Sequence, residues 1–131
     1  MRRLSLATTA VLILSGCSQS PEKAAQQARD AAGSWGATLS AAAERWSGGE
    51  ISTRYFQTVV MQAQISLQKE AQTARQSGGD ATAAPVDAVA SHVSTLADAV
   101  RRGDRAAAVD AGHAAASEAP AEKTPPVARP Q

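Results

Sequence analysis

The sequence predicts an all-α fold, a small Ala-rich up-and-down bundle of three to four helices. Apolar residues recur at spacings of three and four along three long segments, which is the period of one face of a helix. No segment shows the alternation of a half-buried strand. Gly-containing breaks of a few residues separate the segments, and short connections of this kind join antiparallel neighbouring helices.

Composition limits both the size of the core and the class of function. The chain has 131 residues, enough for one domain. Because 31 of them are Ala, whose side chain buries little area, the 44% hydrophobic fraction overstates the number of residues that can form a core. Only 17 large apolar residues lie between positions 22 and 117. We therefore expect a thin core, little net stability and a partner surface that completes the core. A net charge of +1 gives no basic footprint for nucleic acid, and one cysteine excludes a disulfide framework.

The first residues have the layout of a secretory signal peptide. Met1-Arg2-Arg3 is a positively charged start, and residues 4–14 form an apolar stretch too short for a permanent membrane span. The next residues, Leu14-Ser15-Gly16-Cys17, resemble the lipobox of bacterial lipoproteins: a Leu, two small residues and a Cys.

The resemblance to bacterial lipoproteins implies a lipid anchor. In that family the Cys thiol receives a diacylglyceryl group, a dedicated peptidase cuts before the Cys, and the new amino terminus is acylated, commonly with palmitate. Residues 1–16 would then be the signal peptide, and the mature chain would start at Cys17 and contact the membrane through its lipid. Several buried acyl chains make such attachment effectively permanent. Ser18, in place of an Asp, resembles lipoproteins sorted to the outer membrane, where the protein would face the periplasm.

A helical domain is predicted from 22 to 117, after a short polar tether at 17–21. Its first helix covers 22–46, where Gly33 and Gly36 favour a kink, and Ser47-Gly48-Gly49 ends it. The apolar line of this helix is Ala24, Ala28, Ala32, Trp35, Leu39, Ala42 and Trp46.

The second predicted helix covers 51–76, with Ser52 as a candidate N-cap. Its apolar stripe is Ile51, Tyr55, Val59, Ala63, Leu67, Ala71 and Ala74, widened by Phe56 and Val60. Met61 and Ile65 fall on the opposite side and form a small second apolar strip.

Two further helices and a tail complete the predicted domain. Pro85 suits the first turn of a third helix, whose seam is Val86, Val89, Val93, Leu96 and Val100. Gly103 and Asp104 suit a helix stop and the N-cap of a fourth helix at 105–117, in which Val109 is the one large apolar residue. Residues 118–131 have the Pro-rich, polar composition of a disordered tail.

Four aromatic residues near the first turn are the main candidate site in the domain: Trp35, Trp46, Tyr55 and Phe56. A short hairpin would bring Trp46 beside Tyr55 or Phe56. The cluster is either a pocket for a partner or ligand or the bulky part of a thin core, and we favour the core interpretation.

No metal, cofactor or catalytic site is predicted. His92 and His113 have no ligand set at helical spacing that reaches the three or four groups of a zinc site, and we expect both on solvated flanks. Neither a nucleophile elbow, a phosphate loop nor a pair of carboxylates at catalytic spacing is present. We therefore expect a protein that is not an enzyme.

The expected function is that of a membrane-anchored periplasmic lipoprotein acting as a structural or protein-interaction module of the cell envelope, with an envelope protein or a second copy as its partner. Two alternatives stay open. One is an immunity or inhibitor lipoprotein directed against a toxin or enzyme. The other is a periplasmic helical module that binds a ligand or a metal ion through the aromatic cluster or the histidines.

Overall fold

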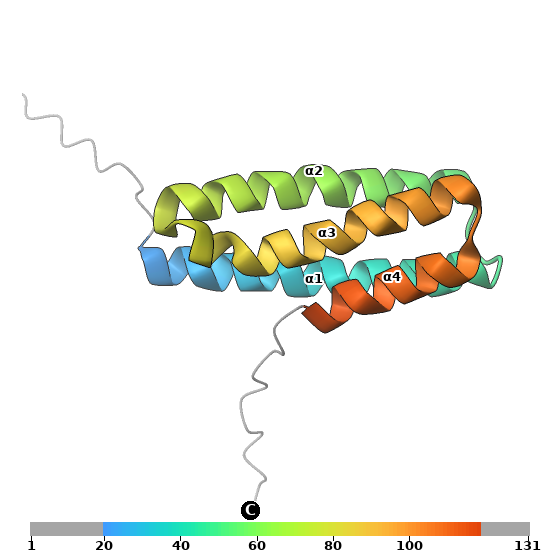
Figure 1. Ribbon diagram of the computed structural model, residues 1–131, viewed down its shortest axis with the longest axis horizontal. Coiled ribbons are helices and arrows are strands. Elements are labelled where there is room, and N and C mark those ends of the chain that lie inside the picture. Colours follow the sequence, from blue (N-terminus) through green and yellow to red (C-terminus); the bar gives the residue numbers. More distant parts are fainter. Residues whose placement is uncertain (1–19, 119–131) are drawn as a thin grey trace, which may run out of the picture.

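The computed structural model describes residues 20–118, which form four consecutive antiparallel helices: α1 (Pro21–Ser47), α2 (Thr53–Gly78), α3 (Asp80–Arg102) and α4 (Arg105–Glu118) (Figure 1). The described part of the chain contains no strand, so the predicted all-α up-and-down bundle is confirmed. Residues 1–19 and 119–131 lie outside the described residues, and with them the predicted signal peptide, Cys17 and nearly all of the predicted tail.

The four helices do not surround the core evenly. α1 contacts the other three helices, whereas α2 and α4 do not contact each other. α4 has 14 residues against 23 to 27 in the others and covers only part of their length (Figure 1). The fold is therefore a bundle of three long helices, with α4 packed over α1 and α3 at the end opposite the start of α1.

The core of the described chain is built from small side chains. No polar or charged side chain is buried among the described residues, and twelve of the 22 buried hydrophobic residues are Ala. Their small side chains let the helix backbones approach closely. The largest fully buried side chains include Trp46, Phe56 and three leucines.

α1 begins at Pro21, one residue inside the predicted tether, because the side chain of Ser20 caps it by accepting a hydrogen bond from the Lys23 backbone N–H. The helix then continues through Gly33 and Gly36 to Ser47. The predicted kink at these glycines therefore does not interrupt the helix. Gly36 is buried against α4, and this packing compensates for its low helix propensity.

The buried line of α2 differs from the predicted stripe at its start. Tyr55 is 59% exposed, whereas Phe56 and Val60 are buried. The core line is Phe56, Val60, Ala63, Leu67, Ala71 and Ala74. Ser52 is the N-cap, as predicted, and its hydroxyl accepts a hydrogen bond from the Tyr55 backbone N–H at 3.1 Å.

The turn between α2 and α3 is shorter than predicted. α3 begins at Asp80, and Pro85 lies inside the helix rather than in its first turn. The chain reverses at Gly79 alone, whose φ of 81° favours glycine. Arg75 of α2 then pairs with Asp80 and with Asp87, which joins the end of α2 to the start of α3.

The remaining predictions for α3 and α4 are confirmed. All five residues of the predicted α3 seam are buried. Gly103 has φ 69°, and the Asp104 carboxylate accepts a hydrogen bond from the Ala107 backbone N–H at 3.0 Å. α4 ends at Glu118, one residue beyond the predicted domain, and buries only Ala108, Ala111, Gly112 and Ala115.

Candidate functional site

Of the four predicted aromatic residues, the structure brings two together. The ring centroids of Trp46 and Phe56 lie 5.3 Å apart with planes tilted by 38°. Both side chains are buried, and the Trp46 indole N–H donates a hydrogen bond to the Thr53 hydroxyl at 3.0 Å. The pair therefore fills the core at the α1–α2 turn, which confirms the core interpretation for these two residues.

The other two aromatic residues do not join this pair. The half-buried Trp35 packs against the core, and its indole N–H donates to the Ser66 hydroxyl of α2 at 3.1 Å. Tyr55 points to solvent. The four residues consequently do not line one aromatic pocket.

Arg105 makes a contact between α4 and the end of α1 that the sequence did not predict. Its guanidinium lies 5.1 Å from the centroid of the Trp46 ring and donates to the backbone carbonyls of Trp46 and Ser47. A cation at these carbonyls stabilises the C-terminal end of α1, where the Trp46 carbonyl also accepts a hydrogen bond from the Gly49 backbone N–H at 3.1 Å. The contact joins residues almost 60 positions apart, so helical spacing carries no signal for it.

Both histidines have a carboxylate partner on another helix. His113 Nε2 of α4 lies 2.7 Å from Glu44 Oε1 of α1, and His92 Nε2 of α3 lies 3.4 Å from Glu118 Oε1 of α4. The expectation of solvated flank positions holds for His113, which is exposed, whereas His92 is half-buried. Within residues 20–118 no group of three or more His, Cys, Asp or Glu side chains could hold a metal ion.

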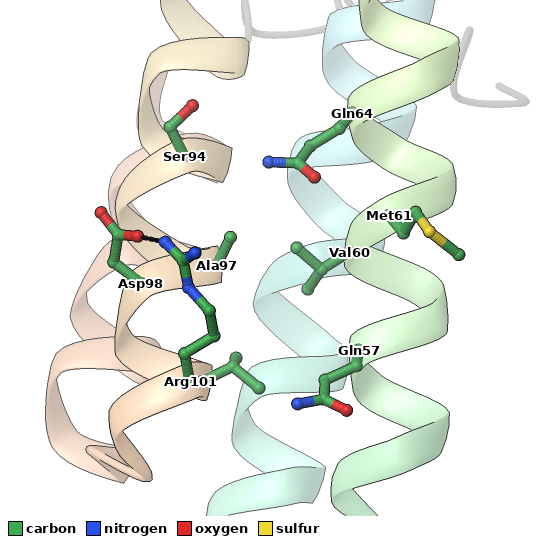
Figure 2. Close-up of a pocket in the computed structure, with 9 residues that line it drawn as sticks. Gln57, Val60, Met61, Gln64, Ser94, Ala97, Asp98 and Arg101 are labelled. Atoms are coloured by element: carbon green, nitrogen blue, oxygen red, sulfur yellow. Dashed lines mark hydrogen bonds and ion pairs between the residues drawn. The ribbon is translucent and has the colours of Figure 1, made fainter.

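An open groove of about 410 Å³ runs between α2 and α3 (Figure 2). Gln57 and Gln64 extend from α2 toward α3, and the Arg101 guanidinium is paired with Asp98 on the α3 side. Further residues of the lining are Val60, Met61, Ser94, Ala97 and Val100. The lining is mostly neutral, and its one cation, Arg101, is paired with Asp98.

α2 carries the large exposed apolar residues of the described chain. Met61 is 54% exposed and Ile65 is 63% exposed, and Tyr55 lies on the same helix. Figure 2 shows the thioether of Met61, at the rim of the groove, extending away from α3, while Val60 points toward α3. The predicted second apolar strip of Met61 and Ile65 is thereby confirmed as solvent-facing.

Comparisons with family profiles, with curated proteins and with solved structures found no match to this chain. Among residues 20–118, no helix combines the length and the apolar character needed to cross a membrane.

Proposed function

We propose that the protein is a lipid-anchored lipoprotein of the bacterial cell envelope, held by Cys17 in the outer membrane and facing the periplasm. Its bundle acts as a structural or protein-interaction module and not as an enzyme. The observation that carries the proposal is the lipobox-like Leu14-Ser15-Gly16-Cys17, which directly follows a basic start and an apolar stretch.

The start of α1 supports a bundle held close to the membrane. Ser20 is the N-cap and Pro21 the first helical residue, so only residues 18–20 separate the proposed anchor from the bundle. Three extended residues span about 10 Å. The end of the bundle with the α2–α3 turn would then lie near the lipid headgroups. The 27 residues of α1 have a length of about 40 Å. The end of the bundle with the α1–α2 turn would then lie about 40 Å from the anchored end.

The distribution of apolar side chains supports an interaction role. The described core is mainly Ala, while Met61 and Ile65, which are larger, face solvent. Burying such side chains against a partner removes apolar area from water and adds stability that the thin core does not supply.

Metabolic labelling with a clickable fatty acid tests the anchor. The wild-type chain should be labelled and membrane-bound, whereas Cys17→Ala should be unlabelled and retain residues 1–16. Ser15→Ala is the matched control, because it keeps a small residue in the lipobox and should be labelled like the wild type. Equal labelling of the wild type and Cys17→Ala would contradict the proposal.

Sorting is tested separately by fractionating the two membranes. The wild-type chain should be recovered in the outer membrane, and Ser18→Asp should shift it to the inner membrane. Recovery of the lipidated wild-type chain in the inner membrane would overturn the outer-membrane assignment and leave the anchor itself intact.

A further inference from the structure

α4 is attached to the bundle without any large buried side chain. Every buried side chain larger than Ala in the described chain belongs to α1, α2 or α3. α4 buries only three alanines and Gly112, and it does not contact α2. Because an alanine side chain buries little apolar area, α4 contributes little to the core that holds the three long helices together. α4 can therefore leave as a unit while the other three helices keep their core.

Two histidine–carboxylate pairs join α4 to its two neighbours, one on each side. His113 Nε2 of α4 lies 2.7 Å from Glu44 Oε1 of α1. Glu118 Oε1, at the end of α4, lies 3.4 Å from His92 Nε2 of α3. The chain has only these two histidines. Both of them consequently lie at the contacts that hold α4.

The strength of these two contacts depends on the charge of the imidazole, which changes between about pH 5 and 8. A protonated His113 forms an ion pair with the Glu44 carboxylate, whereas a neutral His113 forms at most an ordinary hydrogen bond, which is weaker. The same holds for His92 and Glu118. The guanidinium of Arg105 keeps its charge throughout this range, so its contact with the end of α1 does not change.

Carboxylates are the charged groups that the structure places against the two histidines. Besides their partners on the neighbouring helices, Asp110 precedes His113 by one turn of α4 and lies on the same side of that helix. α1 has no charged residue from 31 to 43, and His92 has none three or four positions away on α3. These surroundings favour the protonated imidazole when α4 is docked.

We propose that α4 is a detachable helix whose docking is controlled by the protonation of His92 and His113. Below about pH 6 both pairs are ionic and hold α4 on the bundle, whereas above about pH 7 the imidazoles are neutral and α4 undocks more often. Both pairs are partly exposed, so water weakens them, and we expect each pair to change the undocking equilibrium by about two- to fivefold. Undocking uncovers the side of α1 that carries Gly36.

Hydrogen–deuterium exchange of the full chain in detergent micelles, followed by mass spectrometry, tests the switch. An isolated helix of 14 residues is marginal in water, so the amides of an undocked α4 exchange. Protection factors, which correct for the effect of pH on the intrinsic exchange rate, are compared at about pH 5.5 and 7.5. At the higher pH the protection of α4 peptides should fall by about fourfold or more, since both pairs weaken. Peptides from residues 86–100 of α3 should change far less. An equal loss in α3 and α4 would overturn the proposal, because the bundle would then open as a whole.

Variants that remove the titrating pairs complete the test. Glu44→Gln keeps the size of the side chain and removes its charge, and should reduce the pH dependence of α4 protection. The double variant His92→Gln and His113→Gln should abolish it. Glu70→Gln is the matched control, because it removes a carboxylate from α2, which α4 does not contact, and should keep the pH dependence of the wild type. A double variant that keeps the full pH dependence, or a wild-type α4 whose protection does not change with pH, would overturn the proposal.

Discussion

Gly36 of α1 lies directly against the backbone of Ala115 in α4. A Cβ atom placed on Gly36 would come within 2.8 Å of the Ala115 carbonyl oxygen. Gly112 on α4 makes the reciprocal approach, because its Cβ would lie 3.1 Å from the Cβ of Ala43. The two helices therefore pack at a distance that requires glycine at position 36 and leaves little space for a Cβ atom at position 112. This close approach explains how α4 docks without burying any large side chain.

Replacing Gly36 by Ala should destabilise the protein. The added methyl group meets backbone, which cannot rotate away as a side chain would, and we expect a loss of about 1–3 kcal/mol in the free energy of unfolding. Gly33→Ala is the matched control three residues earlier. A Cβ there has nothing within 4 Å, so the higher helix propensity of Ala should raise stability by up to about 1 kcal/mol. Thermal denaturation followed by circular dichroism measures both, and a Gly36→Ala variant as stable as Gly33→Ala would refute the close approach.

The burial of α3 leads to a second prediction. Leu96 is fully buried, and Leu96→Ala should cost about 2–4 kcal/mol of unfolding free energy through lost apolar contact and a cavity. The exposed Arg102, on the last turn of the same helix, provides the control, and Arg102→Ala should lie within about 0.5 kcal/mol of the wild type. Equal unfolding midpoints for the two variants in a denaturant titration would count against the seam.

Much of the fold follows from local spacing. The α3 seam is unambiguous because its large residues recur at three and four with no competing neighbour. Ser52 and Asp104 are recognisable as caps because their chemistry is local. In α2, however, Tyr55 and Phe56 are adjacent and both apolar. Helical periodicity alone does not decide which faces the core, and the choice rests with Trp46, which packs on Phe56.

Contacts between distant parts of the chain cannot be predicted from the spacing of apolar residues along a helix. From the sequence, Gly36 is a residue of low helix propensity that should weaken its helix. Its role in packing depends on α4, whose backbone lies against it. The pairing of His113 with Glu44 and the contact of Arg105 with Trp46 likewise join α4 to α1 across some 60 to 70 residues. Cys17, the candidate site of lipid attachment, lies outside the described residues. Its lipidation therefore stays a prediction from the sequence.

Pro85 gives the last prediction, because it occupies a position in α3 that its chemistry disfavours. It lacks the N–H that would donate to the carbonyl of Ala81, four residues earlier. Pro85→Ala restores this donor and should stabilise the protein by up to about 3 kcal/mol, less whatever the unfolded chain gains in conformational freedom. Pro21→Ala is the control, since Pro21 stands at the first position of α1, where an N–H has no helical acceptor. Guanidinium denaturation should therefore show a higher midpoint for Pro85→Ala and a nearly unchanged one for Pro21→Ala. A midpoint for Pro85→Ala at or below that of the wild type would mean that the first turn and a half of α3 is not helical in solution, and that the helix begins near Pro85 instead.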